Sequence, residues 1–204
     1  MKKAIPLLSI ALGSLAALPG KASAAIVLYT DKAAFLSMLT TSFEDDFAAA
    51  GGGGPIVRSG SGFTVTHSAP ASGLYFFPAL QALGNNNTGD SMVAQFSATP
   101  ATAAGADFFS SDVTDAFTFT TITITATTAS GSLSGTVSPT SFTTDVFLGF
   151  ISDEPLLDLT VTALGGPNFL GYDNFIVGTA VPEPASAAFG LASLVMFTRR
   201  RRSR

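Results

Sequence analysis

The sequence contains no cysteine and no tryptophan, and it has a single histidine among 204 residues. Without cysteine the chain can form no disulfide, no zinc site built from thiolates and no cysteine nucleophile. His67 is the one side chain that could act as the base of a Ser–His–Asp triad, and no Gly-x-Ser-x-Gly motif accompanies it. A domain made from this chain must therefore be held by its hydrophobic core, or by a core and a metal ion.

Basic residues are scarce in the central part of the chain. Between Ala25 and Ala180 there are two, Lys32 and Arg58, against thirteen acidic residues, which gives a net charge near −11. So acidic a surface repels phosphate backbones, and we expect no binding to nucleic acid. Attraction to divalent cations is the natural alternative.

The first 24 residues have the organisation of a secretory signal peptide. Lys2 and Lys3 precede an apolar run over Ala4–Leu18, and Pro19 and Gly20 end that run. Ala22 and Ala24 are the small residues that a signal peptidase reads, so we expect cleavage after Ala24. The alternative is a retained anchor helix.

The last 24 residues, 181–204, read as a second targeting segment. They comprise an extended strip, Val181, Pro182, Glu183 and Pro184, then an apolar run over Ala185–Thr198, then a basic end that includes Arg199, Arg200, Arg201 and Arg202. As a helix the apolar run would reach about 21 Å, against a hydrocarbon core of roughly 30 Å. A short transmembrane anchor of this kind would keep its arginines on the cytoplasmic side as a stop signal.

This order of a Pro-Glu-Pro strip, a short apolar helix and terminal arginines resembles the PEP-CTERM sorting signal. The resemblance implies an exported protein of a Gram-negative bacterium that makes exopolysaccharide. It further implies recognition of Pro182, Glu183 and Pro184 by a membrane-embedded exosortase that cleaves the tail. The alternative is an ordinary C-terminal anchor with incidental prolines.

Between the two targeting segments, residues 25–180 predict one all-β domain with a single short helix. Asp31 or Thr30 is expected to cap a helix that runs to about Thr40. About ten short strands with Gly, Pro, Asn and Ser turns favour an antiparallel two-sheet sandwich. The expected strands are Ala25–Tyr29, Gly62–His67, Leu74–Phe77, Met92–Phe96, Ala106–Phe109, Asp115–Thr127, Gly131–Val137, Phe142–Ile151, Leu156–Leu164 and Asn168–Val177.

Three details of this pattern are specific enough to test. Asp115–Thr127 reads as one long strand with a bulge near Thr120–Thr121, because its apolar positions change phase there. Leu156–Leu164 predicts a buried stripe of Leu157, Leu159, Val161 and Ala163. Leu83–Asp90 is rich in turn-forming residues and predicts a loop.

Three short motifs of the central domain resemble a recurrent PEP-CTERM ectodomain. They are Phe43–Asp46, Phe147–Ser152 and Tyr172–Phe175. The resemblance implies a jelly-roll sandwich like that of carbohydrate-binding modules, in which the first and last strands are neighbours. Glu44 and Asp45 would then approach Asp173, and carboxylates from two distant segments suit a structural calcium ion. The alternative is that these residues are solvated or cap turns.

The sequence favours a non-enzymatic protein of the cell surface or extracellular matrix that contacts exopolysaccharide or other envelope glycans. It would be anchored briefly in the inner membrane and then processed by an exosortase. A calcium-dependent carbohydrate-binding module is the first alternative, and a glycan hydrolase is the second. A third alternative, ice binding, is suggested by the threonines between Thr118 and Thr128, although one rank of threonines is too little for a flat array.

Overall fold

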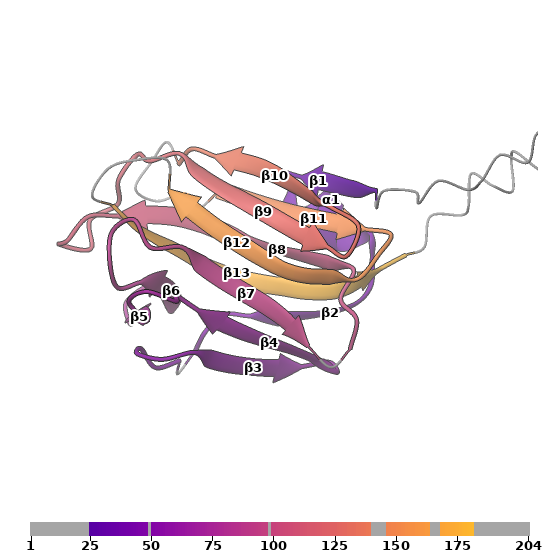
Figure 1. The fold of residues 1–204 in the computed structure, drawn as a ribbon, viewed down its shortest axis with the longest axis horizontal. Helices are drawn as coiled ribbons and strands as arrows, with labels where there is room; N and C mark the ends of the chain where they lie inside the picture. The colour runs from indigo at the N-terminus through magenta and orange to yellow at the C-terminus, as the bar shows by residue number, and fades with distance from the viewer. Residues whose placement is uncertain (1–24, 49, 98, 140–145, 164–167, 182–204) are drawn as a thin grey trace, which may run out of the picture.

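The computed structural model describes residues 25–48, 50–97, 99–139, 146–163 and 168–181. In these residues the chain forms two antiparallel sheets that pack face to face, with one short helix outside them (Figure 1). The expected all-β, two-sheet antiparallel architecture is confirmed. No helix within these ranges is long and apolar enough to cross a membrane.

The seven-stranded sheet is organised around β13 (Phe169–Ala180), which is its longest strand. Strand β13 pairs with β8 (Ala103–Ser111) along one edge, and on the other edge it pairs with β2 (Leu39–Asp45) and β6 (Ala82–Asn85). Beyond β8 the sheet continues through β11 (Val146–Ser152) to β1 (Ile26–Tyr29), and beyond β6 it ends at β5 (Leu74–Phe77). The first strand, β1, therefore pairs with β11 rather than with the last strand as expected, and the neighbour of β13 is β2, the strand that carries Glu44 and Asp45.

The six-stranded sheet lies over the first. Its strand order is β10 (Ser132–Val137), β9 (Ile122–Thr128), β12 (Leu156–Ala163), β7 (Met92–Ser97), β4 (Phe63–Ser68) and β3 (Ile56–Gly60). Alternation along these strands sends apolar residues inward and polar residues outward. In β4, for example, Phe63, Val65 and His67 are buried, while Thr64, Thr66 and Ser68 are only partly covered.

The core between the sheets is rich in aromatic side chains. Phe47, Phe108, Phe150 and Tyr172 are at most 1% exposed, and Phe63 and Phe175 are nearly as well covered. Full burial of one such side chain contributes about 1.5–3 kcal/mol. In the absence of disulfides, this aromatic core is the main source of stability.

Helix α1 (Lys32–Ser37) packs on the outer face of the seven-stranded sheet. The Asp31 side chain accepts a hydrogen bond from the Ala34 backbone N–H at 2.7 Å, which confirms Asp31 as the cap. Phe35 is fully buried against Phe147, with ring centroids 5.3 Å apart. The helix ends three residues earlier than predicted, because Leu39 already begins β2.

The structure corrects the prediction of one bulged strand over Asp115–Thr127. Residues 112–116 form a turn held by Asp112, whose Oδ1 accepts hydrogen bonds from the backbone N–H groups of Thr114 and Ala116. The chain then folds back, and Phe117 bridges to Ser111 and packs on Phe109. Strand β9 begins only at Ile122, so the change of phase marks two separate segments rather than a bulge.

Two other expectations are also corrected. Leu157 is 49% exposed, because a register shift between Leu156 and Asp158 turns Leu156 inward in its place. Leu159 and Val161 of the same predicted stripe are buried as expected. Residues Ala82–Asn85 are not part of a loop but form β6, which pairs with β13 through Leu83 and Gly84. The loop that was expected from Leu83 therefore begins after Asn85.

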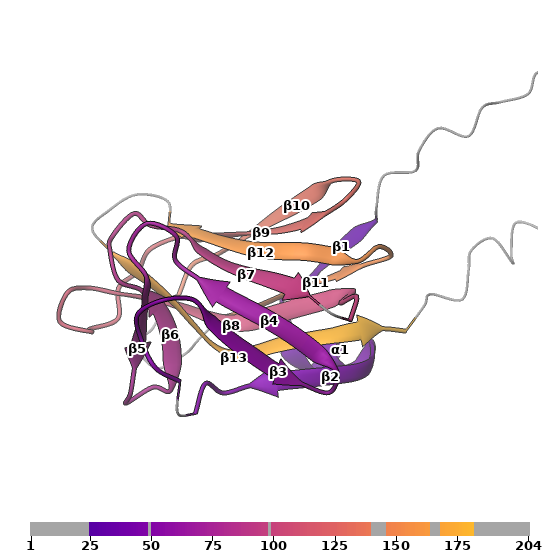
Figure 2. The same ribbon diagram turned by 60° about the horizontal axis from the view of Figure 1, so that its bottom comes forward.

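Both ends of the described chain lie at the same end of the sandwich. The start of β1 and the end of β13 are on the right in Figures 1 and 2. A hollow of about 470 Å³ is lined by residues from both, including Ala25 and Val181. Of the two predicted targeting segments, 1–24 and 181–204, all residues except Val181 lie outside the described part of the chain.

Candidate functional site

Two adjacent acidic residues near the end of β2, Glu44 and Asp45, were predicted to bind calcium. Strand β2 lies beside β13, with Asp45 opposite Phe175 and Glu44 opposite Ile176. Since neighbouring residues of a strand face opposite sides of the sheet, Asp45 points into the sandwich and Glu44 points away from it. Each of the two carboxylates forms an ion pair with a basic side chain of the protein, Asp45 with Arg58 and Glu44 with Lys32.

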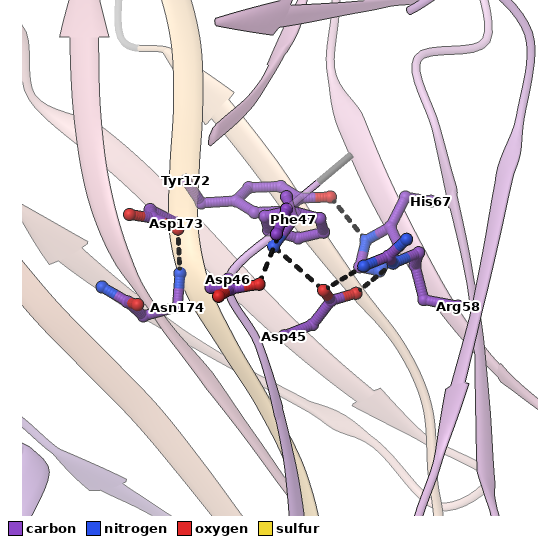
Figure 3. A network of polar contacts seen from close by, with 9 residues as sticks. Asp45, Asp46, Phe47, Arg58, His67, Tyr172, Asp173 and Asn174 are labelled. Atoms are coloured by element: carbon purple, nitrogen blue, oxygen red, sulfur yellow. Dashed lines mark hydrogen bonds and ion pairs between the residues drawn. The ribbon is translucent and has the colours of Figure 1, made fainter. Parts of the chain in front are cut away.

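Asp45 forms a partly buried ion pair with Arg58 of strand β3 (Figure 3). Arg58 Nε donates to Oδ2 of Asp45 at 2.5 Å and Nη2 donates to Oδ1 at 2.7 Å, which is the two-pronged geometry that favours arginine. The Asp45 side chain is only 3% exposed. The hydrogen bond to Asp45 raises the pKa of Arg58. The pair joins β2 of one sheet to the edge strand β3 of the other.

Asp45 also shapes the turn that follows β2. Its Oδ1 accepts a hydrogen bond from the Phe47 backbone N–H at 2.9 Å. Phe47 has a φ of 53°, a left-handed conformation that costs about 1–2 kcal/mol for a residue with a side chain. Full burial of the Phe47 ring offsets this cost. Asp45 is thus a structural residue that holds a turn and closes one side of the sandwich.

His67 and Tyr172 form a second buried polar pair beside the first. His67 Nδ1 and the Tyr172 hydroxyl are 2.8 Å apart, and the imidazole is enclosed by the rings of Phe47 and Phe175. His67 Nε2 is buried and has no hydrogen-bond partner among the described residues. Burial lowers the pKa of His67 to about 3 and raises the pKa of Tyr172. His67 is therefore a neutral core residue at physiological pH.

Lys32 occupies the outer side of β2. Its Nζ lies 2.9 Å from Oε1 of Glu44 and 3.0 Å from Oδ2 of Asp107 on β8. Burial of Lys32 lowers its pKa, but the hydrogen bonds to Glu44 and Asp107 together outweigh this effect and raise it. Asn174 Nδ2 donates to the same Asp107 oxygen at 3.0 Å. The two basic residues of the central domain, Lys32 and Arg58, thus both neutralise acidic residues of β2.

The predicted calcium set of Glu44, Asp45 and Asp173 is not brought together as one site. Asp173 lies on β13 opposite Asp107, and its Oδ1 accepts the Asn174 backbone N–H at 2.6 Å. Within the described ranges, no group of three or more histidine or acidic side chains is placed to hold a metal ion. Strand β2 presents its two carboxylates to opposite faces, where Lys32 pairs with Glu44 and Arg58 pairs with Asp45. Calcium binding itself stays a prediction.

A different surface, which the sequence did not predict, covers the outer face of the six-stranded sheet. Serine and threonine occupy the outward positions of these strands, apart from Val57, Val93, Gln95, Leu157 and Asp158. We call this surface the hydroxyl face. Its hydroxyl residues are Ser59, Thr64, Thr66, Ser68, Ser97, Thr123, Thr125, Thr127, Ser132, Ser134, Thr136, Thr160 and Thr162.

The hydroxyl residues stand in rows across β10, β9 and β12, and beyond β12 the strand β7 places Val93 opposite Thr160 and Gln95 opposite Asp158. Thr125 lies opposite Ser134 on one side and opposite Thr160 on the other, and Thr123 lies between Thr136 and Thr162 in the same way. Adjacent strands are about 4.8 Å apart, so neighbours in a row are within reach of one another. The hydroxyls of Thr125 and Ser134 are 2.8 Å apart, and those of Ser59 and Thr64 are 3.1 Å apart.

The hydroxyl face is almost free of charge although the protein is strongly acidic. Asp158 is the one charged residue among the outward positions, and it accepts a hydrogen bond from Thr160 at 3.3 Å. Other carboxylates lie in turns, including Asp90, Asp112, Asp115, Asp153 and Glu154. Each hydroxyl can both donate and accept, so the face offers a dense, uncharged hydrogen-bonding surface. It carries no aromatic side chain on which a sugar ring could stack.

Sequence reasoning recognised one strand of this face and missed the rest. The alternation in Thr123, Thr125 and Thr127 is visible along the chain, but β12, which extends its rows, and β7, β4 and β3, which carry further hydroxyls, are distant in the sequence. Their assembly depends on the order β10-β9-β12-β7-β4, in which β12 and β7 are neighbours although about sixty residues separate them. A count of serine and threonine at the outward positions of every amphipathic strand would have indicated this face.

Most of the predicted targeting residues lie outside the described part of the chain. This holds for Ala22, Ala24, Pro182, Glu183, Pro184, Arg199, Arg200, Arg201 and Arg202, whose roles stay predictions. Val181 is described: its backbone N–H donates to the Met38 carbonyl at 2.7 Å, and its side chain is 42% exposed. The predicted sorting strip therefore begins directly where the sandwich ends.

Comparisons with known proteins found no match, whether with protein-family models, curated proteins or solved structures.

Proposed function

We propose that this protein is an exported cell-surface or matrix protein whose hydroxyl face contacts uncharged polysaccharide. In this proposal residues 1–24 direct export, and residues 181–204 form a PEP-CTERM-like signal that an exosortase processes after brief anchoring in the inner membrane. The body is a jelly-roll-like sandwich of the kind found in carbohydrate-binding modules. It acts by binding and has no catalytic role.

The hydroxyl face is the observation that carries this proposal. A polysaccharide exposes many hydroxyls, each of which can donate to or accept from a serine or threonine. One such hydrogen bond contributes about 0.5–1.5 kcal/mol, so a single sugar would bind weakly and a long chain would bind through many contacts. A matrix protein needs this distributed adhesion rather than tight capture of one sugar.

The charge distribution favours an uncharged glycan over an anionic one. The acidic turns around the sandwich would repel carboxylated or sulfated polymers, and both basic residues of the body are already paired. An uncharged chain can lie across β9 and β12 without this repulsion. Binding of the predicted kind should therefore depend little on salt.

The test of this proposal is co-sedimentation of the exported protein with insoluble neutral glucan or with the host's own exopolysaccharide. The double variant Thr125→Val/Thr160→Val removes two adjacent hydroxyls while it keeps the side-chain shape, and we expect binding to weaken about 5- to 20-fold. Thr41→Val, which removes an exposed hydroxyl from β2 of the other sheet, is the matched control and should bind normally. Equal binding by both variants would contradict the assignment of the hydroxyl face.

A chelator separates this proposal from the calcium-dependent alternative. Binding that EDTA abolishes would favour a calcium-dependent module, whereas we expect binding to be unchanged. Release of reducing sugars from the bound glycan would favour a hydrolase.

The sorting proposal has its own test, which does not depend on sugar binding. Intact-mass analysis of the protein recovered from the envelope should show a chain that lacks its C-terminal arginines. Replacement of Pro182, Glu183 and Pro184 by alanine should leave the unprocessed chain in the inner-membrane fraction. Equal processing of the wild-type chain and the triple-alanine variant would contradict recognition of this strip by an exosortase.

Ice binding is a second candidate, because the structure places threonines side by side where the sequence showed one rank. Thr123 lies opposite Thr162, and Thr125 lies opposite Thr160. The twist of the six-stranded sheet, visible in Figure 2, works against a match to a flat crystal plane. Measurement of thermal hysteresis decides the matter, and we expect none.

A further inference from the structure

The first described residue, Ala25, is held by a carboxylate that follows β11. Its backbone N–H donates to Oδ1 of Asp153 at 2.9 Å, and the Asp153 N–H donates to the Ala25 carbonyl at 3.3 Å. This reciprocal contact continues the β1–β11 ladder, whose last pair is Ile26 opposite Ser152. The Asp153 side chain thus takes the place that a backbone carbonyl would have in the next rung.

We propose that Asp153 is a docking site for the free N-terminal ammonium group that signal-peptide cleavage creates on Ala25. This inference rests on the proposed export of the protein and on cleavage after Ala24. Hydrolysis adds one water across the Ala24–Ala25 amide. Ala24 leaves with a carboxylate, and the Ala25 nitrogen becomes a primary amine that takes up a proton.

The same contact becomes stronger when the amide becomes an ammonium group. The amide offers one hydrogen to Asp153, whereas the ammonium offers three and adds a full positive charge. Ala25 and Asp153 are both exposed, and both line the hollow of about 470 Å³ between β1 and the end of β13. Water in this hollow can accept the remaining hydrogens, so the new charge needs no rearrangement of the fold.

The electrostatic surroundings also favour a cation at this position. Asp153 and its neighbour Glu154 are the charged groups of the turn after β11, and Glu154 is engaged by the Ser130 hydroxyl. The other residues that line the hollow, among them Val27, Thr102, Ile151 and Thr179, carry no charge. Lys32 and Arg58 are already paired with residues of β2, so the ammonium on Ala25 would be the third cation of the acidic body.

The ends of the mature chain would then meet at one place. Val181, the first residue of the sorting strip, lines the same hollow as Ala25. Docking of the new N-terminus fixes β1 at the edge of the seven-stranded sheet, close to the point where the chain leaves β13. Signal cleavage would therefore strengthen the attachment of β1 at the end of the sandwich from which the sorting strip extends.

The composition of the chain makes a clean experiment available. Lysine occurs at positions 2, 3, 21 and 32, so a chain cleaved after Ala24 has only two amines, the Ala25 α-amine and Lys32. The full-length gene is expressed with export, and intact mass and N-terminal sequencing identify the first residue. Trace acetylation over a range of pH, followed by peptide mass spectrometry, then measures the pKa of each amine separately.

We expect the α-amino pKa of Ala25 to lie about half a unit above the ordinary 7.7–8.0. Asp153→Asn should return it to the ordinary range, and 1 M salt should remove most of the difference. Glu154→Gln removes the same charge one residue further along and serves as the matched control, with at most a small change. Lys32 provides an internal reference that neither substitution should move.

The outcomes separate this proposal from the one on which it rests. A mature chain that begins at Ala25 but has the same α-amino pKa in the wild type and in Asp153→Asn overturns the docking site and leaves export intact. A mature chain that begins at another residue overturns the cleavage point and the docking site together. A shifted pKa that Asp153→Asn abolishes and Glu154→Gln preserves supports both.

Discussion

His67 is a residue whose burial has a direct consequence for stability. Its imidazole is fully buried, its Nε2 has no hydrogen-bond partner in the described part of the chain, and burial lowers its pKa to about 3 from an ordinary 6.5. Between these two values the unfolded chain binds a proton that the folded chain does not bind. The unfolded state is therefore favoured as the pH falls through this window.

We predict that the free energy of unfolding falls as the pH is lowered from about 6.5, by at most about 1.4 kcal/mol per pH unit. Above pH 6.5 His67 is neutral in both the folded and the unfolded chain, so it no longer makes the free energy of unfolding depend on pH. Urea unfolding at pH 8, 6.5, 6 and 5 measures it. Since the chain has no other histidine, His67→Leu should flatten the slope between pH 6.5 and 5, and an unchanged slope would refute this account.

Asp45 gives the second prediction at the level of single residues. Asp45→Asn leaves Arg58 beside an uncharged partner and should lower the free energy of unfolding by about 2–4 kcal/mol. This is below the loss for a fully buried pair, because the Arg58 side chain keeps 27% of its surface exposed. Thermal or urea unfolding at pH 7 provides the measurement.

The matched control is the adjacent carboxylate on the other face of β2. Glu44→Gln breaks the contact with Lys32, but this pair is 30% and 45% exposed and should contribute less than about 1 kcal/mol. Similar losses for the two variants would show that Asp45 does not join the two sheets in the way described.

At the scale of elements, the close pairing of β8 with β11 can be tested through a glycine. A Cβ on Gly105 would meet the Cα of Gly149 at 2.8 Å and the carbonyl oxygen of Leu148 at 2.9 Å, and both belong to the backbone of β11. Gly105→Ala must therefore push two strands apart and should cost about 1–3 kcal/mol. Gly54→Ala is the control, because a Cβ there meets nothing within 4 Å. Equal melting temperatures for the two variants would contradict this pairing.

The elements that the sequence predicted well are those in which one pattern dominates. Strands such as β4 alternate cleanly, and Asp31 caps α1 as expected. The failures occur where tertiary contacts override the local pattern. Leu157 faces outward because a register shift turns Leu156 inward, and Phe117 folds back onto Phe109 because the Asp112 turn reverses the chain. The register shift leaves no mark in hydrophobic periodicity, and the chain reversal leaves only a change of phase that a bulge would explain equally well.

The candidate sites illustrate the same limit. The approach of β2 to β13 was predictable, but the direction in which Asp45 and Glu44 point is set by the register of the sheet. The partners Arg58 and Lys32 come from segments on opposite faces of β2. A calcium site was therefore inferred from proximity alone, while the hydroxyl face went unrecognised because its rows exist only in the assembled sheet.

At the scale of the whole molecule, acidic turns surround a neutral face. The central domain carries a net charge near −11, yet Asp158 is the one charged residue among the outward positions of the six-stranded sheet. Charge of this kind keeps an exported protein soluble and separate from its copies. The neutral face is the part of the surface on which an uncharged polymer could lie without electrostatic cost.

The most direct measurement is a titration of the exported protein with a neutral polysaccharide, followed by NMR of labelled threonine methyl groups. We predict that the methyl signals of Thr125, Thr160 and Thr66 shift together, while those of Thr41 and Thr114, which lie away from the hydroxyl face, stay in place. Shifts confined to threonines outside the hydroxyl face, or no shift at a concentration at which the protein co-sediments with the glycan, would contradict the account.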